Sequence, residues 1–336
     1  MKYDMKQWLM DLCTSKPQKP LPILSFPSAS LLGISVRELI ASSEQQAEGM
    51  RLVAERVHAS ASVSLMDLSV EAEAFGASVL FSDDEVPNVV GQLIHDEAEA
   101  DALEIPTVGS ARSGIYVDAI RRAKELITDR PVLAGMIGPF SLAARLCDVS
   151  EIMMTCYDDP DTVHTVLKKA TAFLIEYARA FCAVGADGIL MAEPVAGLLS
   201  PSLEAEFSAP YVKEIIDAVQ TREFAVIYHN CGDNTPMMVD SMLSTGAAAY
   251  HFGNSIDLRA MLEKFPSDVP VMGNIDPAGV LRQGTPDSVR VATKNLLEQC
   301  AHFPNFVLSS GCDIPPATPW ENLDAFFASA EEFYAK

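Results

Sequence analysis

Short apolar runs alternate with amphipathic stretches along most of this 336-residue chain. Each run is rich in β-branched or aromatic residues, which is typical of a buried strand, and most are followed by helical periodicity. Repeated strand–helix units with short Gly-, Pro- or Asp-rich connections predict parallel strands with helical crossovers. About eight such units, without a polar linker between halves, favour a single (β/α)8, TIM-type barrel over a doubly wound sheet. The strands are expected at 22–26, 62–68, 131–137, 188–192, 225–228, 248–252, 269–273 and 306–309.

The stretches between these runs predict the helices and one hairpin. Residues 79–81 are expected to form a hairpin arm between the turn-forming residues Gly76 and Asp83. Residues 1–20 are expected to form a helical extension, and residues 1–336 are interpreted as a single domain, although length alone does not decide this. The helices are expected at 36–59, 118–128, 142–155, 161–183, 203–220, 236–243, 258–265, 288–300 and 321–334.

Composition excludes several classes of protein. A formal net charge of −22 argues against nucleic-acid binding, which needs clustered Lys and Arg; the acidity either maintains solubility or forms a docking face for a basic partner. No apolar stretch approaches the ~20 residues that span a bilayer. The N-terminus does not resemble a signal peptide, so a cytoplasmic location is expected. Seven cysteines, an odd number, indicate thiols or metal ligands, not a disulfide framework. No Gly-rich phosphate loop occurs.

Soft ligands follow two of the expected strands. His229 and Cys231 follow the run 225–228, and Cys312 follows the run 306–309. In a parallel barrel all strand C-terminal ends face one side, where the chemistry of such enzymes lies. Side chains alternate along a strand, so His229 and Cys231 are expected to point the same way. One imidazole and two thiolates suit Zn²⁺, with a fourth position left for a substrate, although His-x-Cys alone is a weak signal.

Other polar residues at strand ends are candidates for the same site. Glu193 is interpreted as a fourth zinc ligand, a group that orients His229, or a solvated loop residue. His251 ends a predicted strand and is a candidate to line the pocket, with Asp233 as a further catalytic candidate. The acidic residues Asp233, Asp276 and Asp313 either hold a ligand or serve only the turns in which they lie.

A zinc site with two thiolates has a specific chemical use. Such an ion binds a thiol substrate and forces its deprotonation, because ligands bind in their deprotonated form. The thiolate is the nucleophilic form of the group. The predicted site therefore suits the activation of a thiol at neutral pH.

Several ordered motifs resemble the uroporphyrinogen decarboxylase superfamily, and most closely its zinc-dependent cobamide methyltransferase branch. They are Ala192-Glu193-Pro194 with Leu199-Ser200-Pro201, His229-x-Cys231-Gly232, Gly273-Asn274-Ile275-Asp276-Pro277, Ser310-Gly311-Cys312 and, in the first half, the segment 69–76. The resemblance implies a (β/α)8 barrel that transfers a methyl group between a corrinoid (methylcobalamin-type), carried by a partner protein, and a small donor or acceptor.

The resemblance also assigns residues. The zinc ligands match His229, Cys231 and Cys312, and Glu193 falls where the family has an acidic residue. Asn274 and Asp276 lie in a family motif and are expected to contact the cofactor. The donor or acceptor stays open among a thiol such as coenzyme M, tetrahydrofolate, and a methylated amine, betaine or ether. Neither the oligomeric state nor the direction of transfer follows from the sequence.

One departure weakens the decarboxylase alternative. Decarboxylases of the superfamily resemble one another in an Arg-rich segment after the first strand. The matching residues here, 25–30, contain no arginine, and the next arginine along the chain is Arg37. A porphyrinogen with many carboxylates would lack charge-assisted partners there. Decarboxylation of a porphyrinogen or related acid stays as the alternative activity, and a non-catalytic barrel that binds a corrinoid protein is the third hypothesis.

Overall fold

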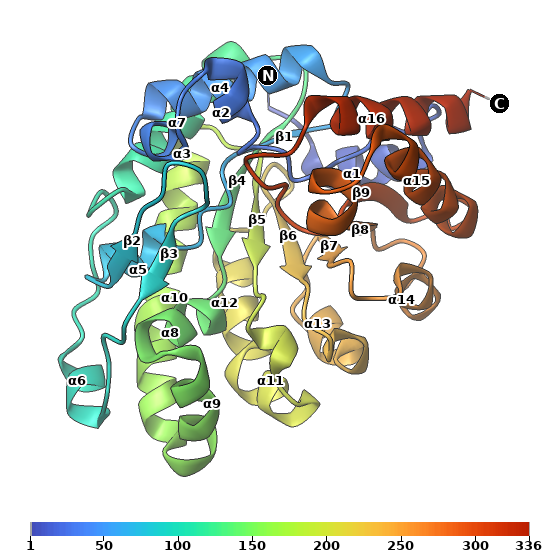
Figure 1. Ribbon diagram of the computed structural model, residues 1–336. Helices are drawn as coiled ribbons and strands as arrows, with labels where there is room; N and C mark the ends of the chain where they lie inside the picture. Colours follow the sequence, from blue (N-terminus) through green and yellow to red (C-terminus); the bar gives the residue numbers. More distant parts are fainter. Residues whose placement is uncertain (1, 336) are drawn as a thin grey trace.

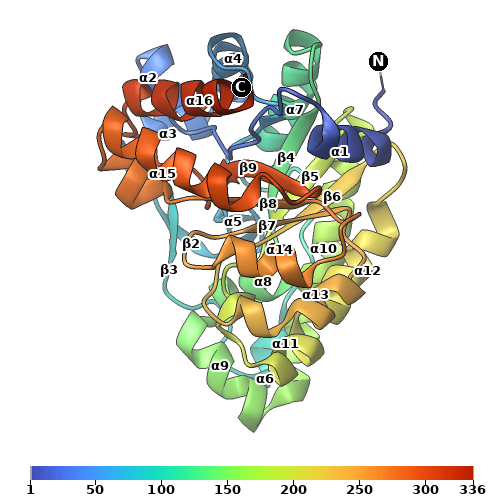
Figure 2. The same cartoon turned by 90° about the vertical axis from the view of Figure 1, so that its right-hand side faces the viewer.

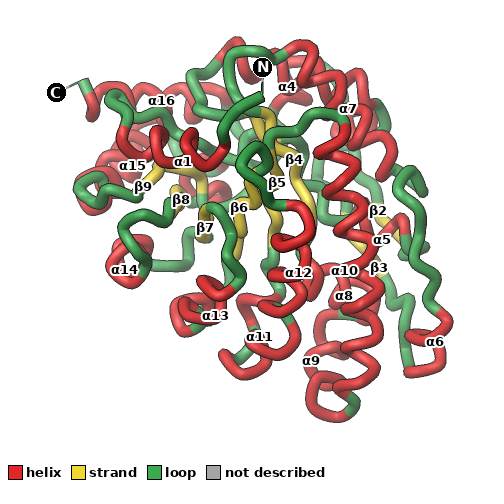
Figure 3. Tube along the Cα trace, turned by 180° about the vertical axis from the view of Figure 1, so that it is seen from behind, coloured by secondary structure: helices red, strands yellow, loops and turns green. Residues whose placement is uncertain are grey.

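The computed structural model describes residues 2–335, in which seven parallel strands form one curved sheet with helices on its outer side (Figure 1; Figure 3). The strands are β1 (Ser62–Val63), β4 (Val132–Ile137), β5 (Gly188–Ala192), β6 (Ala225–Asn230), β7 (Ala249–Phe252), β8 (Val271–Ile275) and β9 (Phe306–Ser310). They neighbour one another in that same order. The expected hairpin is present as the antiparallel pair β2 (Ser78–Leu80) and β3 (Asn88–Val90).

The helices follow the predicted pattern, with several of the longer ones divided. They are α1 (Met5–Thr14), α2 (Ser28–Leu32), α3 (Val36–Ile40), α4 (Ser43–Arg56), α5 (Val70–Ala74), α6 (Glu97–Ala102), α7 (Ser113–Leu126), α8 (Pro139–Cys147), α9 (Val149–Asp158), α10 (Pro160–Ala183), α11 (Pro201–Phe207), α12 (Ala209–Val219), α13 (Val239–Ser244), α14 (Leu258–Lys264), α15 (Pro286–Cys300) and α16 (Trp320–Tyr334), with short helical turns η1 (Ala196–Leu198), η2 (Thr235–Met237) and η3 (Pro277–Arg282).

Capping residues explain two of these divisions. Ser42 accepts a hydrogen bond from the Gln45 amide and starts α4, so the expected helix 36–59 becomes α3 and α4. Asp148 has a φ of 69° and caps the first turn of α9, which divides the expected helix 142–155 into α8 and α9. Side-chain capping competes with helix continuation, and hydrophobic periodicity does not report it.

The barrel is confirmed, but the expected first strand at 22–26 is not a regular strand. The extended segment 20–24 instead closes the gap between β9 and β1. Leu21 N donates to Leu308 O, and Ser60 N donates to Pro20 O, both at 2.9 Å. Pro20 and Pro22 have no amide hydrogen, so this segment cannot form a full ladder with its neighbours.

Two apolar layers explain which way the strand side chains point. Alternate residues such as Val226 and Tyr228 pack between the sheet and the outer helices, whereas Ile227 and Ala225 pack inside the barrel. The inner layer includes buried residues of α1, so this helix covers the N-terminal end of the barrel (Figure 2). The opposite end, where the strands finish, is therefore the open mouth. Within residues 2–335, no helix is long and apolar enough to cross a membrane.

Candidate metal centre

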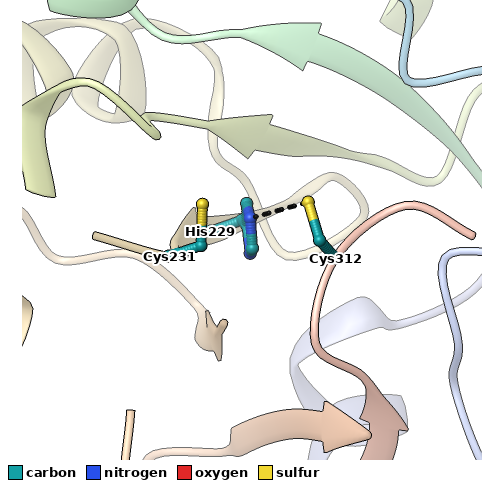
Figure 4. A group of neighbouring side chains, drawn as sticks. All are labelled: His229, Cys231 and Cys312. Carbon is teal, nitrogen blue, oxygen red and sulfur yellow. Dashed lines mark hydrogen bonds between the residues drawn. The ribbon is translucent and has the colours of Figure 1, made fainter. Parts of the chain in front are cut away.

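Three predicted ligands meet at the mouth of the barrel. His229 is in the last part of β6, Cys231 follows that strand, and Cys312 follows β9 (Figure 4). His229 points into the barrel because it keeps the alternation of Ala225 and Ile227. The His229 nitrogen and the two Sγ atoms all lie within 4.8 Å of one another.

The spacing and chemistry of this donor set fit a zinc ion. The Cys312 Sγ lies 3.6 Å from His229 Nε2. A sulfur at ~2.3 Å and a nitrogen at ~2.0 Å from one tetrahedral ion lie about 3.5 Å apart, so the observed separation needs little adjustment. Three protein ligands would leave one position of a four-coordinate zinc ion for a substrate, as in catalytic zinc sites.

The two thiols are coupled without a metal. A hydrogen bond from Cys312 to Cys231 lowers the pKa of Cys231. The same bond, together with burial, raises the pKa of Cys312 to about 12. A metal that binds both sulfurs as thiolates would displace their protons.

A hydrogen-bond relay behind the cluster holds the His229 ring. His229 Nδ1 lies 2.8 Å from His251 Nδ1, and His251 Nε2 lies 2.8 Å from Ser309 Oγ. The Ser309 hydroxyl donates in turn to the Leu21 carbonyl at 2.7 Å. All four residues are buried. His251, expected to line the pocket, lies instead behind the ligand and touches it.

The direction of these bonds fixes the tautomers. A carbonyl only accepts, so the single Ser309 proton is used on Leu21, and Ser309 accepts from His251 Nε2–H. Burial holds the pKa of His251 well below its usual range, so its ring is neutral and its Nδ1 is an acceptor. His229 Nδ1 therefore carries the proton, and the Nε2 lone pair faces Cys312. This is the tautomer that a metal ligand requires.

Glu193 does not join this cluster. Its carboxylate accepts from Phe140 N at 2.8 Å and from both the amide and the hydroxyl of Ser141, which holds the start of α8. The inward alternation of Leu190 and Ala192 turns Glu193 outward. Burial raises the pKa of Glu193 to about 7. Glu193 thus caps the start of α8. It is neither a ligand at the candidate metal site nor a hydrogen-bond partner of His229, which were its expected roles.

The remaining predicted residues lie around the mouth in other contacts. Asn274 Nδ2 donates to the carbonyls of Gly253 and Ile256, and Asp276 accepts from two amides at the start of η3. Asp233 is exposed in the loop after β6. Cofactor contact by Asn274 and Asp276, and catalysis by Asp233, stay predictions. Both carboxylate contacts of Asp276 match the alternative in which it serves the turn.

Two cavities with common lining residues lie at the barrel mouth, and the smaller one borders the cluster. The first, of about 50 Å³, is lined by Ile23, Met66, Leu68, Ala192, Pro194, His229, Cys312 and Asp313. The second, of about 270 Å³, is lined by Met66, Leu68, Glu85, Val86, Pro87, Arg145, Arg282, Asp313, Pro315 and Pro316. Three residues are common to both. Asp313 is one of them, and burial holds its pKa well above its usual range.

Sequence reasoning missed a buried ionic network after β1. Arg112 donates to Glu73 at 2.6 Å and to Ser69 at 2.8 Å, and it pairs with Asp67. The Tyr116 hydroxyl also donates to Asp67, at 2.7 Å. The available signal was the position of Asp67 near the end of the expected strand 62–68. Arg112, which precedes α7, and Tyr116 within α7 are too distant in sequence from Asp67 to be recognised by spacing.

The sequence matches the uroporphyrinogen decarboxylase (URO-D) family over residues 9–333, so the chain belongs to this family. It is 26% identical to the methylcobamide:CoM methyltransferase MtbA of Methanosarcina acetivorans, covering 98% of both chains. A uroporphyrinogen decarboxylase of Coxiella burnetii is 28% identical over 74% of this chain and 70% of its own.

The solved structures agree with these sequence relations. A methyltransferase from Methanosarcina mazei superposes with a TM-score of 0.85 and 25% identity, covering 98% of this chain and 99% of that one. A B12-independent methionine synthase from a Shewanella species, at 14% identity and a TM-score of 0.64, shares the fold. The resemblance inferred from the motifs is confirmed, because the family match and the methyltransferase relatives both extend over nearly the whole chain.

Proposed function

We propose that this protein is a corrinoid-dependent methyltransferase that moves a methyl group between the cobalt of a corrinoid and a small molecule. The observation that carries the proposal is the convergence of His229, Cys231 and Cys312 at the barrel mouth. It occurs in a chain whose whole length resembles a methylcobamide:CoM methyltransferase, while the Coxiella decarboxylase matches a shorter part. Decarboxylation is therefore less supported.

In this proposal His229, Cys231 and Cys312 would be the ligands of a Zn²⁺ ion. Zinc bound there supplies a Lewis acid that favours the deprotonated form of a thiol acceptor or polarises the heteroatom of a methyl donor. His251 and Ser309 act on His229, since they keep its Nε2 lone pair free and directed at the site. The apolar side chains of Met66 and Leu68 limit water beside the reacting group.

The proposed reaction is a displacement at the methyl carbon. In the thiol-accepting direction, a sulfur–carbon bond forms while the cobalt–carbon bond breaks. The electron pair of the broken bond stays on cobalt, and the thiol proton leaves to solvent. The reacting sulfur, carbon and cobalt must lie in line, so the mouth has to admit the face of a corrinoid.

A corrinoid carrier protein is the proposed partner, because a cobalt-bound methyl group does not diffuse without its corrinoid. We place the reaction in the cytoplasm, and the seven free cysteines agree with a reducing compartment. Nucleic acid has no part in the proposal, because the net charge is −22.

Methyl transfer from free methylcobalamin tests the proposal directly. Zinc-loaded protein is incubated with methylcobalamin and a panel of thiols, and loss of the cobalt–carbon absorption is followed together with the mass of the thioether. Cys312→Ala is expected to abolish turnover, whereas Cys300→Ala, at a buried thiol outside the site, retains it. Failure with free and protein-bound corrinoid, across thiol, folate and methyl-donor substrates, would sink the proposal. Conversion of a porphyrinogen would then favour decarboxylation.

A further inference from the structure

Asn230 holds the turn that carries the candidate ligand Cys231. It lies between His229 and Cys231 at the end of β6, and its side chain is fully buried. Asn230 Oδ1 accepts from the Gly232 amide at 3.1 Å and from Thr235 Oγ1 at 2.8 Å. The first of these bonds spans Cys231 and forms an Asx-turn, in which the Asn side chain takes the place of a backbone group. The backbone on both sides of Cys231 is therefore tied to the Asn230 side chain.

The same turn packs closely against the segment after β5. A Cβ on Gly197 of η1 would overlap Asn230 Oδ1 and the Gly232 backbone, so glycine is needed at position 197 for this contact. Asn234, further along the loop, donates from its amide to Gly197 O at 3.1 Å. The loop that carries Cys231 thus rests on η1 and is tied to Asn230.

The bond to Gly232 fixes which way the Asn230 amide group faces. A backbone N–H only donates, so the atom that meets Gly232 N is the carbonyl Oδ1, and Nδ2 is directed to the other side. Within residues 2–335, the buried Nδ2 has no acceptor. Asn230 shares the outer face of β6 with Tyr228, two residues earlier, whereas His229 points into the barrel. The unpartnered donor therefore belongs to the outer side of the strand.

Three further buried residues contribute unpartnered polar atoms on that side, and together they form the outer polar group. They are Tyr228, Ser208 at the junction of α11 and α12, and Glu204, four residues earlier on α11. All are fully buried, and in the described part of the chain no partner reaches Tyr228 Oη, Ser208 Oγ or either Glu204 oxygen. Burial raises the pKa of Tyr228 well above its usual range. Glu204 raises this pKa further, whereas Ser208 and Asn230 lower it as neighbours of the hydroxyl.

Internal water is the ligand that fits these atoms. Buried polar groups without hydrogen bonds destabilise a fold, and buried waters typically make about three hydrogen bonds to such groups. The carboxylate and the two hydroxyls could bind either water or a cation, but Asn230 Nδ2 only donates and would repel a cation. Water would accept from Nδ2 and donate to Glu204 or Tyr228.

We propose that Asn230 is a positioning residue that fixes the place of the Cys231 thiol at the metal cluster. Internal water bound by the outer polar group holds the Asn230 amide in the orientation that the turn needs. This inference rests on the metal centre of the proposed function and adds a residue that acts on the metal through Cys231. Support passes from the outer polar group to Asn230, and from Asn230 through the turn to the ligand.

Cobalt(II) substitution tests this assignment, because thiolate-to-cobalt charge-transfer absorption reports how many thiolates bind the ion. Metal-free, reduced wild type, Asn230→Ala, Asn230→Ser and Tyr228→Phe are titrated with Co²⁺, and zinc affinity is measured by displacement of cobalt. Hydrogen exchange of the Gly232 amide in the metal-free proteins reports the turn itself. Thermal unfolding of each variant measures its stability.

Asn322→Ala is the matched control. Asn322 is a buried asparagine of α16 whose Nδ2 donates to the carbonyls of Leu281 and Gly284, at 2.8 and 3.0 Å. Its replacement also removes buried amide hydrogen bonds, but outside the metal cluster. It should lower stability and leave cobalt absorption, zinc affinity and the exchange of the Gly232 amide unchanged.

Asn230→Ala is expected to bind zinc roughly 10- to 100-fold more weakly, the loss typical of groups that orient a ligand, with less charge-transfer absorption per bound cobalt. Its Gly232 amide should exchange faster. Asn230→Ser should recover part of both properties, because a serine hydroxyl can accept from the same amide. Tyr228→Phe should weaken zinc binding by roughly 2- to 10-fold, about the contribution of one hydrogen bond.

Wild-type zinc affinity in Asn230→Ala, or unchanged exchange of its Gly232 amide, would overturn the assignment. Lower stability with unchanged absorption per bound cobalt would show a merely structural role and would overturn it as well. Wild-type zinc affinity in Tyr228→Phe would overturn the part assigned to the outer polar group. Should Asn230→Ala fail to fold, Asn230→Ser and Tyr228→Phe decide between the same outcomes.

The same proteins separate this assignment from the proposed function. A wild type without thiolate-to-cobalt absorption would overturn both the metal centre and the role of Asn230. Metal binding that does not depend on Asn230 would overturn the role of Asn230 alone. Metal binding that depends on Asn230, in a protein that transfers no methyl group to any acceptor, would reject the methyltransferase and retain the positioning role.

Discussion

Replacing Ser309 by alanine removes one hydroxyl from the relay behind the metal cluster. In the wild type this hydroxyl accepts from His251 Nε2 at 2.8 Å and donates to Leu21 O at 2.7 Å. Both partners are buried, and an orphaned buried group costs about 1–3 kcal/mol. His251 can avoid this cost by moving its proton to Nδ1, where it would meet the Nδ1 proton of His229. His229 must then move its own proton to Nε2 and lose the lone pair that faces Cys312 and the candidate metal site.

The expected result is a loss of metal affinity that exceeds any general damage. Changes to groups that orient a ligating histidine typically cost about 10- to 100-fold in affinity, and we expect Ser309→Ala to fall in that range. Zinc affinity is measured by competition with a chromophoric chelator, and the free energy of unfolding is measured in metal-free protein. Ser309→Thr keeps a hydroxyl and should restore much of the affinity.

Ser329→Ala is the matched control. Ser329 is a buried serine of α16 whose hydroxyl also donates to a backbone carbonyl, that of Ala325 at 2.7 Å, far in sequence from the cluster. It should lower stability without changing zinc affinity. If Ser309→Ala loses stability but binds zinc as tightly as the wild type, the claim that the relay orients His229 is refuted. Nitrogen chemical shifts that place the His229 proton on Nε2 in the wild type would refute it independently.

Three further predictions concern other parts of the molecule. Wild type is expected to bind one zinc per chain; under chelator competition Cys312→Ala should lose it and Cys300→Ala should retain it, and equal zinc content in both variants would contradict the ligand assignment. Burial raises the pKa of Glu71 to about 7 from 4.5, so its charging destabilises the folded state increasingly between those pH values. Urea unfolding should therefore show that the stability of wild type relative to Glu71→Gln falls by up to about 3 kcal/mol as pH rises through that window. A flat difference would show that Glu71 titrates normally. Gly232→Ala would place a methyl group against the Gly197 backbone. Thermal unfolding should then show a loss of roughly 1–3 kcal/mol in stability, and zinc titration should show weaker binding. Unchanged stability and zinc affinity would contradict this contact.

The convergence of the three candidate metal ligands was predictable from the sequence, because parallel strands of one sheet end at the same edge. His229, Cys231 and Cys312 converge as expected, although His229 and Cys312 are 83 residues apart. The outward position of Glu193 also follows from the sequence, once Leu190 and Ala192 are recognised as inward residues. Position at the end of a strand does not by itself predict that a residue joins the site. The alternation of inward and outward side chains along the strand decides which side the Glu193 carboxylate faces.

Other features depend on contacts that no local pattern reports. Ser309 completes the relay only because β7 and β9 both direct polar side chains inward, and serine in a strand has no distinctive signature. The proline-containing segment 20–24 looks like a strand by hydrophobicity, but it lacks the amide hydrogens for a ladder.

The structure separates the three candidate metal ligands from most of the residues that line the larger cavity at the barrel mouth. His229 and His251 lie within strands, and their mutual contact is fixed by the register of β6 against β7. A ligand held on paired strands and oriented through its second nitrogen keeps its geometry before any substrate arrives. Arg145 and the Arg282–Glu85 pair belong instead to α8, η3 and the hairpin connection. Substitutions at these cavity residues can therefore change the shape of the barrel mouth without moving the three candidate metal ligands.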